Sequence, residues 1–182
     1  MESDSDDVGA GAPSILRNRA KEESTPHFHR IDHIAIAVHD LEAAISFFCD
    51  ILGFQLKRRL HIKGRNTGMM SAELQNGDIR FVLCKGTEPG SQVSELVRAH
   101  GVVVAHIALE VDDVDTAVEV LKSRGLAFDT SVIRGPGLIQ AFSTRSPDTG
   151  ISFEIIHREG EDEFLQSNVQ QLFDQLEQAG KY

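Results

Sequence analysis

The chain has few of the features that mark secreted, membrane-spanning or nucleic-acid-binding proteins. Only two of its 182 residues are cysteines, which is too few for a disulfide framework. No apolar run at the N-terminus suggests secretion, and the longest apolar runs elsewhere are far too short to cross a bilayer. Its 18 Lys and Arg are outnumbered by 28 Asp and Glu, so no excess of positive charge is present to neutralise phosphates. These absences predict a cytoplasmic protein with no membrane or nucleic-acid partner, which leaves a small molecule or another protein.

The composition predicts one globular domain preceded by an arm. With 41% hydrophobic residues, a chain of this length can bury a single core. Residues 1–30 differ from the rest, because they are rich in Ser, Asp, Glu, Gly and Ala and have no sustained apolar period. They are expected to form a flexible arm, and residues 31–182 the domain.

Two segments of the domain repeat one pattern, and each begins with a histidine, His33 or His106. Bulky and small residues alternate after each histidine, and seven residues on comes an aspartate, Asp40 or Asp113, that opens a helical pattern. The alternation predicts strands with one bulky apolar face for a core. The histidine lies on the other face with small residues such as Ala35, and this face is expected to line a cavity.

Three strands are predicted after each of these helices. They lie at about 54–61, 69–75 and 78–84, and again at about 126–133, 138–145 and 150–157. A short helix at about 91–100 joins the two units, and an amphipathic helix at about 162–179 follows them. The predicted fold class is α+β, with two βαβββ modules at about 31–85 and 103–158.

A third polar residue, Glu154, lies within an otherwise apolar strand and shares its face with Ser152. An isolated carboxylate in such a setting costs several kcal/mol unless it is paired or bound to a metal. His33, His106 and Glu154 together form the two-histidine, one-carboxylate ligand set of non-heme Fe(II) oxygenases. The alternative is a pair of hydrogen-bonded core histidines and a glutamate paired with an arginine. The metal site is favoured because all three residues fall on the small-residue faces of repeat-related strands.

The duplication also predicts how many ligands the site has. Aligning the last strands of the two modules puts Val82 opposite Glu154, and valine cannot bind a metal. A site with three protein ligands favours a bidentate substrate plus O₂ over simple Lewis-acid isomerisation. Cys84 shares the face of Val82 and is expected to reach the cavity, either as a small buried hydrophobe or as a redox-sensitive thiol. Arg80 is interpreted as a solvated strand-end arginine, with attraction of a substrate carboxylate as the alternative.

The twin βαβββ pattern with these three polar residues resembles the vicinal oxygen chelate superfamily, whose paired modules form a cup-shaped mixed sheet around a divalent metal. More specifically, residues from about 31 to 180 resemble the C-terminal catalytic half of the 4-hydroxyphenylpyruvate dioxygenases. The segments that carry this resemblance are IDHI at 31–34, NGDIRF at 76–81, SQV at 91–93, AHIA at 105–108, GLIQAFS at 137–143, FEIIHREG at 153–160, and the tail from Phe164 through Asn168 to Phe173.

The resemblance implies an Fe(II)-dependent dioxygenase that acts on a 2-oxo acid with O₂, by oxidative decarboxylation and hydroxylation. His33, His106 and Glu154 would be the iron ligands, and Co, Ni, Mn or Zn are the alternative metals. A homodimer is expected, because the chain has only one pair of modules. The residues predicted to line the substrate, from the resemblance and from the shared strand faces, are Gln92, Gln140, Phe142, Phe164, Phe173, Cys84, Val82 and Ser152.

The chain departs from that family at three positions. Cys84 stands where the family carries an asparagine that reaches the substrate, Ala105 replaces a glutamine, and Val169 replaces a phenylalanine. A site that lacks buried polar partners for a phenol hydroxyl loses selectivity for it, so a different 2-oxo acid is expected, with an aliphatic or unsubstituted aryl side chain. Two other functions stay open: a metal-dependent isomerase or lyase of the epimerase or glyoxalase kind, and a non-catalytic protein that binds a small molecule.

Overall fold

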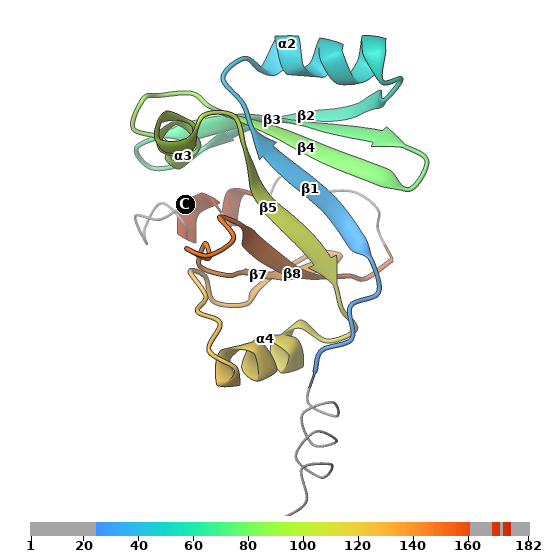
Figure 1. Ribbon diagram of the computed structural model, residues 1–182, viewed down its shortest axis with the longest axis vertical. Helices are drawn as coiled ribbons and strands as arrows, with labels where there is room; N and C mark the ends of the chain where they lie inside the picture. The colour runs from blue at the N-terminus through green and yellow to red at the C-terminus, as the bar shows by residue number, and fades with distance from the viewer. Residues whose placement is uncertain (1–24, 161–168, 172, 176–182) are drawn as a thin grey trace, which may run out of the picture.

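One eight-stranded mixed sheet dominates the fold (Figure 1). The structure, a computed structural model, describes residues 25–160, 169–171 and 173–175. Most of the predicted arm, Phe164 and much of the predicted C-terminal helix therefore lie outside the described residues. The strands are β1 (Ile31–Ala37), β2 (Gln55–Lys63), β3 (Gly68–Asn76), β4 (Ile79–Gly86), β5 (Val103–Glu110), β6 (Ile133–Gly135), β7 (Leu138–Phe142) and β8 (Ser152–Arg158). The helices are α2 (Leu41–Ser46), the π-helix η1 (Phe47–Ile51), α3 (Gln92–His100) and α4 (Val114–Ser123).

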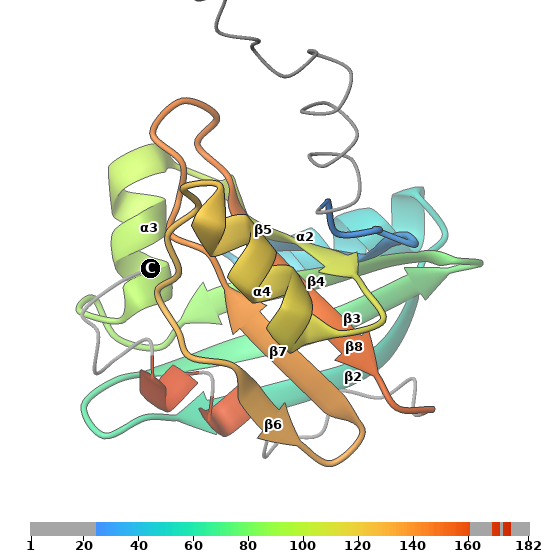
Figure 2. The same ribbon diagram turned by 90° about the horizontal axis from the view of Figure 1, so that it is seen from below.

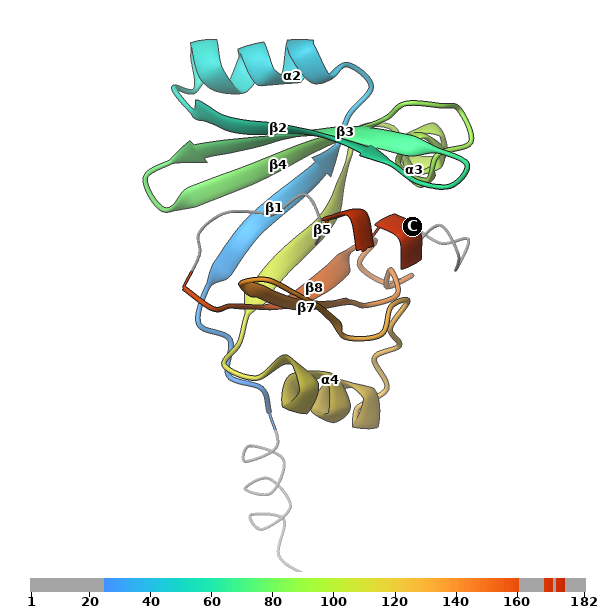
Figure 3. The same ribbon diagram turned by 180° about the vertical axis from the view of Figure 1, so that it is seen from behind.

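The order of the strands confirms the duplication. The sheet runs β2-β3-β4-β1-β5-β8-β7-β6, so each module contributes four neighbouring strands and the second order mirrors the first. β1 pairs in parallel with β4, β5 pairs in parallel with β8, and β1 and β5 join the two modules as an antiparallel pair. The sheet curls so that its two halves face each other across β1 and β5 (Figures 1 and 3).

Helices α2 and α4 cover the outer face of the sheet. Asp40 caps α2 by accepting hydrogen bonds from the amides of Glu42 and Ala43, and Asp113 caps α4 by accepting one from Thr116. The apolar face of α2 packs on the outer face of the first module, and that of α4 packs on the outer face of the second. Helix α4 lies across β7 and β8 (Figure 2). Within the described residues, no helix has both the length and the apolar character needed to span a membrane.

The inner face carries the small residues, as the alternation predicts. Ala35 and Ala37 of β1 are fully buried there, in one cluster with α3 and with Phe173 from the C-terminal part of the chain. Residues 169–171 and 173–175 are helical and lie between the two halves of the sheet (Figure 3). Val169 packs against the inner face of both modules. The C-terminal residues therefore fill part of the cup, as their apolar pattern predicts.

One predicted strand differs from the structure. In place of a strand at 126–133, the structure has only an isolated bridge at Phe128 and the short β6. Side chains of this segment bond to the region of β7 instead: the Asp129 carboxylate accepts a hydrogen bond from the Thr144 hydroxyl, and the Thr130 hydroxyl accepts one from the amide of Phe142. Side-chain bonds of this kind compete with a regular ladder, so this edge of the second module is irregular.

Candidate metal centre

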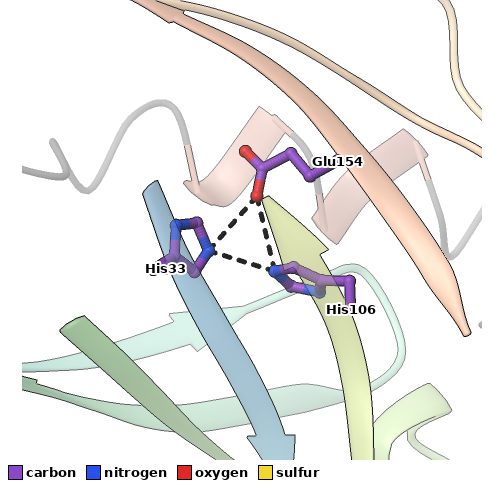
Figure 4. Close-up of side chains that lie close together, drawn as sticks. All are labelled: His33, His106 and Glu154. Atoms are coloured by element: carbon purple, nitrogen blue, oxygen red, sulfur yellow. Dashed lines mark hydrogen bonds and ion pairs between the residues drawn. The ribbon is translucent and has the colours of Figure 1, made fainter. Parts of the chain in front are cut away.

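The structure brings the three predicted ligands together on the inner face of the sheet. His33 lies on β1, His106 on β5 and Glu154 on β8, and these three strands are neighbours in the sheet. The Nε2 atoms of the two histidines lie 3.2 Å apart, and Oε2 of Glu154 lies 3.2 Å from His33 Nε2 and 3.4 Å from His106 Nε2 (Figure 4). The three donor atoms thus form a nearly equilateral triangle.

The dimensions and chemistry of this triangle fit one metal ion. Ligand atoms about 2.1 Å from a metal lie about 3.0 Å apart at octahedral angles and about 3.4 Å apart at tetrahedral angles. The second oxygen of Glu154, Oε1, is buried and has no hydrogen-bond partner among the described residues, which leaves part of the cost of burying this carboxylate uncompensated there. Two imidazoles and one carboxylate suit Fe(II), Mn, Co, Ni or Zn. Among the described residues, no other group of three His, Cys, Asp or Glu side chains gathers in this way.

Val82 occupies the position in the first module that Glu154 occupies in the second. Val82 on β4 pairs with Ala35 on β1, and Glu154 on β8 pairs with Ala108 on β5. Ala35 and Ala108 each follow their module's histidine by two residues. The predicted equivalence is therefore present in the sheet, and the position from which a fourth ligand would come is apolar.

A residue that the sequence analysis missed, Asp32, holds His33 from behind. The Nδ1 atom of His33 lies 2.8 Å from Oδ1 of Asp32, and the Asp32 side chain is fully buried. Strict alternation would turn these adjacent residues to opposite faces. The pairing of β1 with β5 shifts register between Ile31 and His33, and a bulge of this kind re-aims a side chain. The sequence did contain one signal for this role of Asp32. Histidines that bind a metal usually donate their second N–H to a carboxylate or carbonyl, and Asp32 is the carboxylate next to the predicted ligand His33.

Two buried arginines and a second carboxylate surround Asp32, and the half-exposed Arg30 lies 4.0 Å from its Oδ2. Arg158 donates from Nε to Asp32 Oδ2 (2.6 Å) and from Nη2 to Oδ1 (2.8 Å). Arg80 Nη1 lies 3.6 Å from Asp32 Oδ1, and Arg80 Nε lies 3.2 Å from Glu73 Oε1. The expectation that Arg80 is a solvated strand-end residue was wrong, because it is only 9% exposed. Asp32 and Glu73 place two carboxylates against it inside the cup, which offsets the cost of burying its charge.

The charges of this cluster set the protonation states of the two histidines. Burial by itself lowers the pKa of His33, but the carboxylates of Glu154 and Asp32 outweigh that effect and raise its pKa to about 9. Burial and the positive charges of His33 and Arg145 lower the pKa of His106. The pKa of Asp32 is lowered, since hydrogen bonds from Arg158 and His33 overcome its burial. Of the two histidines, His33 is therefore the one that these charges favour in the protonated form, and a metal ion bound here would displace that proton.

Several of the predicted substrate-lining residues adjoin this triangle. Phe142 pairs with Glu154 across β7 and β8, and its ring meets the His106 ring edge to face at 5.1 Å. Gln140 lies on the same strand and is buried. Ser152 lies beside His106, but its hydroxyl donates to the Ser143 carbonyl at 2.7 Å. This wall of the site is therefore formed by β7 and β8.

The other predicted lining residues lie toward the first module and α3. Cys84 and Phe173 belong to one buried apolar cluster, and Val82 packs against it. Burial raises the pKa of the Cys84 thiol to about 12, so it behaves as an apolar group, not as a reactive thiolate. Both polar atoms of the Gln92 amide, at the start of α3, are buried without a hydrogen-bond partner in the described part of the chain. Phe164 lies outside the described residues.

The geometry agrees with a comparison against known families. The model of the glyoxalase/bleomycin resistance protein/dioxygenase superfamily matches residues 30–155. The chain belongs to this superfamily. Its paired modules and curled mixed sheet are the vicinal oxygen chelate fold, as the resemblance predicted.

Relatives within the superfamily differ in what their names say they do. A 4-hydroxyphenylpyruvate dioxygenase of Legionella pneumophila is 28% identical over 184 residues, covering 81% of this chain and 53% of its own. The mitochondrial methylmalonyl-CoA epimerase of Mus musculus is 30% identical over 106 residues, covering 57% of this chain and 58% of its own. A solved variant of 4-hydroxymandelate synthase from Streptomyces coelicolor superposes with a TM-score of 0.73 at 24% identity, covering 81% of this chain and 53% of its own. The chain spans about half the length of the dioxygenases it matches.

Proposed function

We propose that the chain is an Fe(II)-dependent dioxygenase that acts on a 2-oxo acid. The observation that carries this proposal is the three-ligand centre, with Val82 at the position from which a fourth ligand would come. Three protein ligands leave adjacent positions for a bidentate substrate and for O₂. Bound Fe(II) would supply the Lewis acidity that holds the 2-oxo acid and the redox chemistry that lets O₂ react with it. The dioxygenase relatives support the same assignment.

The charges around the site suit an anionic substrate. Asp32 and Glu73 carry two negative charges, and Arg80 and Arg158 carry two positive charges, so this buried layer is close to neutral. Glu154 leaves one net positive charge on a divalent ion, which complements the carboxylate of a 2-oxo acid. The ring of Phe142 against His106 helps to exclude water beside this charge.

The residues beyond the triangle favour a substrate with an apolar side chain. Val82, Cys84 and Phe173 form an apolar wall in the first half of the cup. A hydroxyl buried against such a wall would lose its hydrogen bonds to water without gaining others. We therefore expect an aliphatic or unsubstituted aryl 2-oxo acid, and the amide of Gln92, which has no hydrogen-bond partner among the described residues, is the polar group available to it.

Oxygen uptake tests the proposal directly. The full chain is reconstituted anaerobically with Fe(II), and aliphatic, phenyl and 4-hydroxyphenyl 2-oxo acids are added while the visible spectrum is recorded, followed by O₂. We expect a charge-transfer band with the preferred acid, bleaching on oxygenation, and CO₂ release equal to the O₂ consumed. His106→Ala should abolish uptake, whereas His61→Ala, on the exposed side of edge strand β2, should leave it unchanged. No uptake with any acid by an iron-loaded protein would contradict the proposal.

A metal-dependent epimerase or related isomerase is the second candidate. The 30% identity to a methylmalonyl-CoA epimerase favours it. It predicts exchange of a substrate α-proton with solvent deuterium when Co²⁺ is bound and O₂ is absent. Deuterium exchange together with no oxygen uptake would replace the dioxygenase assignment.

A further inference from the structure

The two histidines of the candidate centre are held in different ways. The His33 ring is 2% exposed, and its Nδ1 atom is fixed at 2.8 Å from Asp32. His106 packs edge to face against Phe142, and its side chain is 10% exposed. A carboxylate acceptor at Nδ1 fixes an N–H there, so Nε2, which faces Glu154 and His106, is the atom left to bind a metal once its proton is lost. His33 is therefore the ligand whose orientation the protein specifies most strongly.

Asp32 is in turn held by Arg158. Burying a carboxylate without a partner is costly. The Arg158 guanidinium offsets this cost by donating two parallel hydrogen bonds, at 2.6 and 2.8 Å, to the two oxygens of Asp32. Arg158 ends β8 and lies on the same strand face as Glu154, four residues earlier. Strand β8 thus supplies one ligand directly and contacts a second ligand through Asp32.

We propose that Arg158 is a positioning residue of the metal centre, which acts through Asp32 on the orientation of His33. Without the guanidinium fork, the Asp32 carboxylate can turn toward Arg80, whose Nη1 is 3.6 Å away, and the His33 ring loses its fixed partner. The donor triangle then opens, and metal binding weakens. The inference rests on the metal centre of the proposed function, but not on the reaction or the substrate.

Cobalt binding to the full chain tests this inference without relying on turnover. Co²⁺ affinity is measured by calorimetry for the wild type, Asp32→Asn, Arg158→Gln and the double variant, and the d–d absorption bands of the bound Co²⁺ report the ligand geometry. We expect each single variant to weaken Co²⁺ binding about 10–100-fold and to shift the bands. The double variant should be no weaker than the weaker single one, because both changes break the same connection.

Two controls separate positioning from folding. Arg59→Gln removes an exposed arginine paired with Glu42 on the outer face and should leave Co²⁺ binding unchanged. Arg158→Lys keeps the charge but not the two-pronged geometry, so it should fold even if Arg158→Gln does not, and should still weaken binding and shift the bands. Wild-type affinity and spectrum in folded Arg158→Lys, or additive losses in the double variant, would overturn the inference. A wild type that binds Co²⁺ but never consumes O₂ would contradict the proposed function alone.

Discussion

Val82 and Glu154 occupy equivalent positions in the two halves of the sheet, one apolar and one a candidate metal ligand. Each pairs with the alanine that follows its module's histidine by two residues. A duplicated module could supply four ligands from these positions, two from each half. Because Val82 stands at one of these four positions, the first module offers a metal one protein ligand and the second module offers two. The proposed dioxygenase function depends on the coordination position that is thereby left open.

Replacing Val82 with a carboxylate should therefore convert one kind of centre into the other. Val82→Glu is expected to bind Co²⁺ or Zn²⁺ at least about tenfold more tightly, since it adds a fourth protein ligand, and to lose oxygen uptake. Without metal it should unfold at a lower temperature, because a second buried carboxylate is then uncompensated. Calorimetry and oxygen uptake measure the two effects. Val82→Leu, which adds no ligand, is the control, and undiminished uptake in Val82→Glu would argue against the equivalence.

Metal binding should stabilise the protein through Glu154. An ion present at 100 times its Kd stabilises the folded state by about 2.7 kcal/mol, which raises the Tm of a chain of this size by roughly 5–10 °C. Glu154→Ala is expected to remove that metal-dependent shift, as measured by calorimetric melting with and without Co²⁺. Glu119→Ala, on the exposed side of α4, should keep the full shift. An equal shift in both variants would place the ion elsewhere.

The inner face was predictable from the sequence because its chemistry follows strand alternation. Ala35 and Ala37 beside His33 are small, so the side of the strand that faces the cup could be read directly. Asp32 could not be placed in this way, since a bulge in β1 turns it to the side that alternation excludes. Arg80 was misread because its carboxylate partners come from β1 and β3, and only the folded sheet brings those strands to it.

The acidity of His33 predicts a pH dependence for metal binding. Its pKa is about 9 without metal, because Glu154 and Asp32 outweigh the effect of burial, whereas the unfolded value is 6.5. The metal binds the neutral ring, so the apparent affinity should rise about tenfold per pH unit below 9 and level off above it. Calorimetry in buffers with different ionisation enthalpies should detect about one proton released per ion at pH 7. Release of no proton would show that His33 is already neutral.

Cys84 tests the expected substrate preference. It is 3% exposed within the apolar cluster, so Cys84→Asn places an amide where the described residues offer mainly apolar contacts. The unpaired amide should cost about 1–3 kcal/mol of stability in the free protein. A substrate with a ring hydroxyl would supply the missing partner, so the ratio of kcat/KM for 4-hydroxyphenylpyruvate over phenylpyruvate should rise at least about tenfold. Cys84→Ala removes the thiol without adding a polar group and should leave the ratio unchanged. If both variants change the ratio equally, Cys84 lies away from the far end of the substrate, and the preference for an apolar side chain must come from another part of the wall.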